Sequence, residues 1–272
     1  MKKFFITMMG LLVMLSCGQK PQSSSTGEEE REKLELKTYT FSDSTGMAHV
    51  DISIEYPVKG ESELVDAIRL YIADETGLES DEVELDNAQG VTDFYGRQLM
   101  EEMEGLAEGY EDDDYVVEVY HNWTFSKLYE TADFITFLGE TELYEGGIHG
   151  IAYHEGITFF ENGQRFTSKM LRNTDSDEFQ KLMRKGLKAY FSEDPDNMTD
   201  EELSEELISL GDIYMIPMPV VNPYITKDGV TFIYQPYEIS YYAAGMPQFS
   251  LSLRQIYPFL SKKAIRLLKL DE

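Results

Sequence analysis

An alternation of apolar and polar residues is the first regular pattern along the chain. It runs over 48–56, where the apolar members are Ala48, Val50, Ile52, Ile54 and Tyr56. A period of two residues places these side chains on one face of a β-strand and the polar ones on the other. The pattern therefore predicts one strand of a strand pair, which ends at Pro57 and Gly60.

Helical spacing follows this strand. Ser62 precedes apolar residues spaced four, seven and eight positions apart, namely Leu64, Ile68, Tyr71 and Ile72. This spacing predicts an amphipathic helix. A second helix is expected over about 92–107, with Leu99, Met103 and Leu106 inward, and the acidic run 111–114 is expected to be a loop.

Two-residue alternation returns over 115–160 and predicts a β-meander. The first strand carries Tyr115, Val117, Val119, His121, Trp123 and Phe125 on one face. Further strands are expected at 134–138 and 148–160. Asn162-Gly163 favours a type I′ hairpin turn after them, because both central residues of that turn need positive φ.

The second half mixes helix starts with short strands. Thr174-x-x-Asp177 and Thr199-x-x-Glu202 resemble capping boxes and predict two helices, the second ending near Gly211. A turn at Asp228-Gly229, a strand carrying Phe249, Leu251 and Leu253, and a C-terminal helix follow. Strands that neighbour each other through turns, with helices inserted in blocks, predict an α+β fold with antiparallel β-sheets and helices packed on them.

The N-terminus has the pattern of an export signal. Lys2 and Lys3 precede an apolar run over 4–15 that spans only about 18 Å as a helix, against a hydrocarbon core of roughly 30 Å. Met14-Leu15-Ser16-Cys17-Gly18 is similar to a bacterial lipobox, whose cysteine is lipidated and becomes the first mature residue. We expect a signal peptide at 1–16, lipid attachment at Cys17 and a flexible acidic tether over 17–35. Gly18 favours an outer-membrane or cell-surface location over the inner membrane.

Composition narrows the function classes. The formal net charge is −28, and it becomes −30 without Lys2 and Lys3, with 21 basic against 51 acidic residues. Such a charge repels nucleic acid and accelerates encounters with a cationic partner. Cys17 is the only cysteine, so its lipidation leaves no thiol for a disulfide, a nucleophile or a metal. Residues 36–272 are expected to form one module with halves at about 36–168 and 169–272.

A glycine-rich segment holds the most prominent histidine. Gly146, Gly147 and Gly150 surround Ile148 and His149, and three glycines in five residues permit a tight turn and close backbone approach. In a regular strand from residue 148, His149 and His154 face opposite sides and cannot share one ion. We favour a hydrogen-bonded structural histidine over a catalytic or metal-binding one.

No other motif indicates an enzyme or a cofactor. The acidic clusters at 112–114 and 194–200 lack the ligand spacing and turn glycine of a calcium loop. The chain has no phosphate-binding loop, dinucleotide fingerprint or nucleophile elbow. We therefore predict no metal, no cofactor and no catalytic residues.

The segment 234–245, here called the Tyr-rich loop, is the strongest candidate for a binding surface. It contains four tyrosines, a proline and a terminal glycine, of which Tyr237, Tyr241, Tyr242 and Gly245 are candidate partner-binding residues. Tyrosine offers apolar area and a hydrogen bond at low entropic cost. The alternative is a loop packed onto its sheet with its hydroxyls satisfied locally.

These segments resemble a known extracytoplasmic domain family. Gly146-Gly147-Ile148-His149-Gly150 is similar to its GGAHG element, and Tyr237-Glu238-Ile239-Ser240-Tyr241-Tyr242-Ala243-Ala244-Gly245 to its YEIAPYAAG-like loop. Glu55-Tyr56-Pro57 resembles the beginning of its N-terminal half. The family is that of the RsiV-type anti-sigma factors, shared with the N-terminal region of PdaC-type peptidoglycan deacetylases. The resemblance covers most of 38–262, with Ile148 and Tyr241 replacing an alanine and a proline.

The resemblance implies an α+β module that binds extracytoplasmic ligands, in one branch lysozyme. We therefore expect a non-catalytic, lipid-anchored envelope protein that binds a cationic protein such as lysozyme, or peptidoglycan. Gly146, Gly147, His149 and Gly150 join the loop residues as candidate contacts. The alternatives are an envelope assembly protein without a small ligand, and a peptidoglycan-acting enzyme that uses His149.

Overall fold

The computed structural model describes residues 32–79, 83–110, 117–208 and 213–270, which belong to one compact unit, Glu32–Glu272. Cys17, the part of the predicted tether (17–35) before residue 32, and the acidic run 111–114 lie outside the described residues. No helix in the described ranges is long and apolar enough to cross a membrane.

A five-stranded sheet forms the first half of the unit. The order of the strands across the sheet is the same as their order along the chain: β1 (Glu35–Ser44), β2 (Ala48–Lys59), β3 (Val119–Glu130), β4 (Phe134–Tyr144) and β5 (Ile151–Phe160). All neighbours are antiparallel except β2 and β3, which run parallel. The parallel pair arises because the chain crosses back between them through α1 (Ser62–Glu75) and α2 (Ala88–Glu108).

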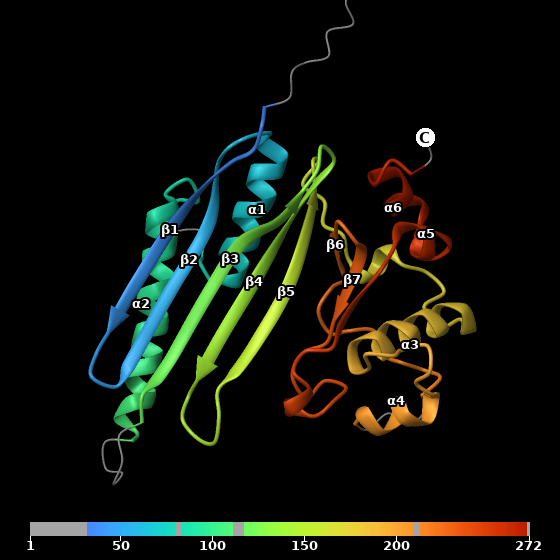
Figure 1. Cartoon of the computed structure of the whole chain (residues 1–272). Coiled ribbons are helices and arrows are strands. Elements are labelled where there is room, and N and C mark those ends of the chain that lie inside the picture. Colours follow the sequence, from blue (N-terminus) through green and yellow to red (C-terminus); the bar gives the residue numbers. More distant parts are fainter. Residues whose placement is uncertain (1–31, 80–82, 111–116, 209–212, 271–272) are drawn as a thin grey trace, which may run out of the picture. The chain divides into compact units, whose positions relative to one another are not determined.

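The two helices cover one face of this sheet. Figure 1 shows α1 and α2 behind the strands, with the other face open toward the viewer. The apolar side chains of β2 and β3 face the helices, among them Val50, Ile52, Trp123 and Phe125, and all four are buried. Burial of about 1.5–3 kcal/mol per such side chain makes this face the first hydrophobic core.

A second core holds the rest of the chain together. The short strands β6 (Tyr224–Thr226), β7 (Gly229–Ile233) and β8 (Gln248–Leu251) form an antiparallel sheet. Helices α3 (Asp177–Phe191), α4 (Asp200–Glu206), α5 (Leu253–Ile256) and α6 (Lys262–Leu267) surround it. Three single turns, at Ser168–Met170, Tyr242–Ala244 and Tyr257–Phe259, join these elements. Phe179, Met183 and Leu187 of α3 meet Phe232 of β7 in the interior.

Hydrogen bonds tie the second half of the unit to β4 and β5. The Thr136 hydroxyl donates to the Ile225 carbonyl at 2.7 Å, and the Ile225 N–H donates to the Thr158 hydroxyl at 2.9 Å. The Gln235 side-chain amide bonds both the N–H and the carbonyl of His154, at 3.1 and 2.8 Å, as a neighbouring strand would. The two cores therefore form one connected unit.

The predicted α+β class is confirmed, with some local corrections. Pro57 lies inside β2, and Leu253 begins α5 instead of ending a strand. Ser176, not Thr174, caps α3 by accepting from the Phe179 N–H. The hairpin after β5 is not type I′, because among the described residues from Glu161 to Gly163 only Gly163 has positive φ. The chain instead reverses through a three-residue loop, 161–163, whose last residue, Gly163, has the left-handed conformation.

Candidate functional site

The Gly-rich turn, residues 146–150, joins β4 to β5 instead of beginning a strand. We predicted a strand from residue 148, but β5 begins at Ile151. Gly146 and Gly147 have φ of +94° and +102°, values that other residues rarely adopt. A Cβ on Gly146 would also lie 2.1 Å from the Tyr110 hydroxyl. The backbone therefore reverses here, and it leaves the Ile148 side chain 100% exposed.

His149 lies at the tip of this turn with both ring nitrogens in hydrogen bonds. Its Nδ1 is 2.8 Å from the Gly150 carbonyl, which assigns the proton to Nδ1. Its Nε2 is 3.2 Å from the Tyr237 hydroxyl, which then acts as donor. The ring stacks on Tyr242 with centroids 3.9 Å apart. His149 thus joins the Gly-rich turn to the Tyr-rich loop.

The Tyr-rich loop is held in place along most of its length. Tyr242 donates to the Gly150 carbonyl at 2.6 Å, and buried Tyr234 donates to the Pro217 carbonyl at 2.8 Å. The Glu238 carboxylate accepts the N–H groups of Val220 and Gln235, at 2.7 and 2.8 Å. The loop therefore has a fixed conformation.

Some candidate binding residues hold the two loops together, and others present their side chains to solvent. Tyr237 has φ of +66°, one of three non-glycine residues with positive φ in the described ranges, and it is 52% exposed. Tyr241 is 59% exposed and makes no hydrogen bond through its hydroxyl with any described residue. Gly245 ends the single turn after Tyr241 with φ of +72°. We call Ile148, His149, Tyr237, Tyr241 and Tyr242 the aromatic tip.

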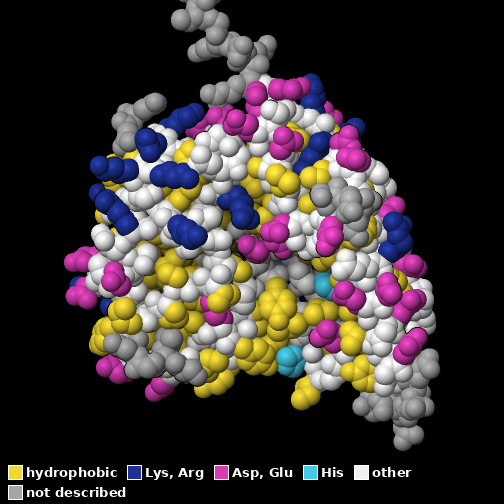
Figure 2. Space-filling view, turned by 180° about the vertical axis from the view of Figure 1, so that it is seen from behind, with side chains coloured by type: hydrophobic (Ala, Val, Ile, Leu, Met, Phe, Trp, Pro, Cys, Tyr) yellow, Lys and Arg dark blue, Asp and Glu magenta, His cyan; other side chains and the backbone are white. Residues whose placement is uncertain are grey.

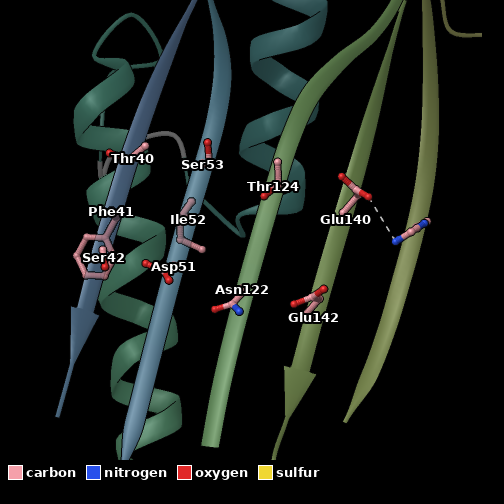
Figure 3. Close-up of a pocket in the computed structure, with 11 residues that line it drawn as sticks. Thr40, Phe41, Ser42, Asp51, Ile52, Ser53, Asn122, Thr124, Glu140 and Glu142 are labelled. Carbon is pink, nitrogen blue, oxygen red and sulfur yellow. Dashed lines mark ion pairs between the residues drawn. The ribbon is translucent and has the colours of Figure 1, made fainter.

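The open face of the large sheet carries a groove that no sequence pattern predicted. Strand register places two rows of polar side chains directly across five strands: Thr40, Ser53, Thr124, Glu140 and His154, then Ser42, Asp51, Asn122 and Glu142. Figure 3 shows these side chains standing on neighbouring strands of one face. They line a groove of about 470 Å³. The alternation of each strand was visible in the sequence, but only the register aligns the rows.

Hydrogen-bond acceptors dominate this groove. Asp51, Glu140 and Glu142 supply carboxylates, and no Lys or Arg lines the groove. A hydrogen bond from Ser42, with a smaller contribution from His49, holds the pKa of Asp51 below its usual value. Glu140 pairs with His154 at 3.5 Å, and Asn122 Oδ1 is buried without a donor among the described residues. The groove thus favours a ligand that donates hydrogen bonds or carries positive charge.

The groove extends in two directions. Glu140 and His154 also line a neighbouring hollow of about 610 Å³ against the small sheet, with Tyr224 and Phe249 on its wall. Toward the β4–β5 turn, the next cross-strand row contains His49, Tyr120 and Tyr144. The Tyr144 hydroxyl donates to the Gly147 carbonyl at 2.9 Å. The open face therefore leads directly to the aromatic tip.

The remaining histidines and acidic clusters form no metal site in the part of the chain that the structure describes. His121 is half-buried on the helix side, where burial lowers its pKa. His154 pairs with Glu140 on the open face, and His49 pairs with Asp51 at 2.7 Å. The predicted opposition of His149 and His154 within one strand does not apply, because β5 begins at Ile151. Asp200 in the second acidic cluster bonds Lys188 at 2.7 Å.

Two partly buried acidic residues, Glu75 and Glu155, lie on the helix side of the sheet. Burial raises the pKa of both Glu75 and Glu155 above the ordinary value, and the Glu75 charge raises the pKa of Glu155 further. Burial also raises the pKa of nearby Tyr71, and the charges of Glu155 and Glu75 add to that rise. Tyr71 donates to Glu155 at 3.4 Å, and the Arg165 guanidinium lies 5.3 Å from the Tyr71 ring centre. This pair makes stability depend on pH.

Comparison with known proteins places the Tyr-rich loop in a described family segment. Residues 170–254 match the DUF3298 family. The family is described as a protein family of unknown function. The DUF3298 segment contains β6–β8 and the Tyr-rich loop but not the Gly-rich turn, so the aromatic tip crosses its boundary.

Solved DUF3298 structures share the fold over most of the chain. A family member from Bacteroides fragilis aligns with a TM-score of 0.68 and 21% identity, over 87% of this chain and 97% of its own. A family protein from Pseudomonas aeruginosa aligns with a TM-score of 0.54 and 14% identity, over 85% and 95% of the two chains. No curated protein matched the chain. The likeness establishes the α+β architecture and nothing about the ligand.

Proposed function

We propose that the protein is a non-catalytic, ligand-binding lipoprotein of the cell envelope. In this proposal a lipid on Cys17 anchors the chain, and the unit from Glu32 onward captures a cationic protein such as lysozyme. The observation that carries the proposal is the aromatic tip, which is exposed and at the same time held rigid by hydrogen bonds.

Rigidity matters because binding otherwise costs the entropy of ordering the loop. The Gly150 carbonyl accepts from both His149 and Tyr242, so one backbone atom fixes both the turn and a loop residue 92 positions further along the chain. Tyr237 keeps its positive φ in this arrangement, a conformation that costs free energy and persists only where its surroundings impose it. Both features suit a surface prepared for a partner.

The exposed members of the tip have the chemistry of interface anchors. Ile148 is 100%, Tyr241 59% and Tyr237 52% exposed. Large apolar and aromatic side chains at the centre of an interface contribute most of its binding free energy. Isolated exposed apolar residues are common, but these three lie on two loops that His149 joins.

Charge favours a basic partner. The groove beside the tip presents three carboxylates without Lys or Arg, and the whole chain carries −28. Opposite charges accelerate association, while the apolar anchors that become buried on binding determine the lifetime of the complex. The same geometry argues against catalysis by His149, because both of its nitrogens already bond within the protein.

Surface plasmon resonance with immobilised hen-type lysozyme tests the proposal. The analyte is residues 18–272, which contain the whole compact unit. We expect binding whose association rate falls as salt shortens the Debye length from about 10 Å at 0.1 M to about 3 Å at 1 M. Tyr241→Ala should raise the dissociation rate roughly tenfold or more, in the range of an interface anchor.

Tyr257→Ala is the matched control, since Tyr257 is also exposed, at 41%, and lies in the single turn before α6. Its dissociation rate should equal that of the unmodified protein. Absence of binding at low salt, or an equal effect of the two substitutions, would overturn capture through the aromatic tip.

A further inference from the structure

Five basic residues form a patch at α6 and at the single turn Ser168–Met170. We define the basic patch as Lys169, Arg172, Lys262, Lys263 and Arg266, all of which are exposed. An antiparallel bridge between Leu171 and Leu260 brings their two segments together. The Arg172 N–H donates to the Phe259 carbonyl and the Ser261 N–H to the Met170 carbonyl, both at 2.8 Å. Residues 87–91 positions apart are thus neighbours.

The patch is opposite in sign to the rest of the protein. Lys and Arg are outnumbered 23 to 51 by Asp and Glu, yet Figure 2 shows basic side chains gathered over one part of the rear face. No member of the basic patch forms an ion pair with a described residue, whereas Lys188 and Lys269 nearby in sequence are paired with aspartates. Five neighbouring cations left unpaired on an acidic chain repel one another and favour an anionic ligand.

The position of the patch indicates which anion. The N-terminal segment enters the unit at β1, and a hollow there is lined by Lys33, Glu35, Lys127 and Glu130. The turn that follows Glu130 holds Asp133, which pairs with Lys269 just after α6. Figure 1 accordingly shows the start of β1 and α6 toward one end of the unit. The aromatic tip lies at the other end of β4, about 35 Å away for an 11-residue strand.

We propose that the basic patch docks on anionic phospholipid headgroups, so that the unit stands on the membrane with the aromatic tip outward. The orientation rests on the proposed lipid anchor at Cys17, whereas the headgroup contact does not. Exposed Tyr257 and Pro258 lie beside the patch and suit the interfacial region. Each basic residue near such a surface strengthens partitioning about fivefold. Acidic residues more than about 8 Å away are screened at physiological salt, so the net charge does not prevent contact.

Vesicle co-sedimentation of residues 18–272, which lack the signal sequence and are used without lipid, tests the contact. Vesicles of phosphatidylglycerol with phosphatidylcholine are compared with phosphatidylcholine alone. We expect binding to the anionic vesicles only, weakening as salt rises. Lys262→Glu with Lys263→Glu should reduce it at least tenfold. Both residues are exposed in the first turn of α6, where a carboxylate is tolerated because the helix dipole favours negative charge.

Arg97→Glu with Lys227→Glu is the matched control, because it changes the formal charge by the same −4 at exposed positions outside the patch. This variant should bind as the unmodified protein does. No sedimentation with anionic vesicles, equal loss in the two variants, or binding to soluble polyphosphate that excludes the vesicles would overturn the proposal. Lysozyme capture is measured separately, so either proposal can fail alone.

Discussion

Gly156→Ala should destabilise the protein by about 2–3 kcal/mol, although it adds one methyl group. A Cβ at this position would lie 2.1, 2.2 and 2.4 Å from three carbons of the Tyr224 ring. Carbon atoms in contact prefer about 3.5–4.0 Å, so the ring would have to move by about 1.5 Å. Tyr224 is buried, and its neighbour Ile225 is hydrogen-bonded to both Thr136 and Thr158. Relaxation is therefore blocked, and overpacking of this kind costs about 1–3 kcal/mol.

Gly139→Ala provides the control within the same sheet. Gly139 lies in β4 beside β5, and a Cβ there would meet its nearest atoms at 3.7–4.0 Å, which is ordinary contact. This substitution should be neutral or stabilising by up to about 1 kcal/mol, because alanine loses less backbone entropy on folding than glycine.

Urea unfolding followed by circular dichroism measures both variants. At about 2–4 °C per kcal/mol for a chain of this size, Gly156→Ala should also lower Tm by about 5–10 °C. If Gly156→Ala unfolds at the same urea concentration as Gly139→Ala, Tyr224 does not pack against β5 as described, and the attachment of the small sheet is wrong.

Two further predictions concern pH and anchoring. Burial raises the pKa of Glu155 in the folded state above its unfolded value of about 4.5, so ionisation of Glu155 lowers the stability as pH rises from about 4.5 through the folded-state pKa. Glu155→Gln should therefore raise Tm at pH 7 and give no gain below pH 4. The control, Glu118→Gln at an exposed position, should change Tm at neither pH. A gain from Glu155→Gln that persists at low pH would contradict this cause. Cys17→Ser should release the protein from the membrane fraction after a salt wash, and retention of the variant would refute the lipid anchor.

Local patterns predicted most of the elements correctly. The alternation at 48–56 became β2, and Thr199-x-x-Glu202 formed the capping box of α4. These features depend on neighbours within about four residues, so the chain itself contains the information. The strand boundary at the Gly-rich turn was wrong, because alternation around residue 148 cannot reveal that Gly146 and Gly147 adopt positive φ.

The candidate site was predicted only in its parts. The sequence identified the Gly-rich turn and the Tyr-rich loop separately, and the resemblance to an extracytoplasmic family suggested that both meet a partner. Their contact through His149, Tyr237 and Tyr242 depends on the packing of the small sheet against β5. The groove had no signal in any single segment, because strand register aligns its polar rows.

The sequence by itself thus determined which residues become strands and helices, which faces of them are apolar, and the acidity of the whole chain. Tertiary structure decided the parallel pairing of β2 with β3, the joining of the aromatic tip, and the gathering of five unpaired basic residues on an acidic protein. The physical reason is one of range. Periodicity and capping act between residues a few positions apart, whereas these three surfaces are assembled by backbone pairings and side-chain contacts between segments about 70–90 residues apart.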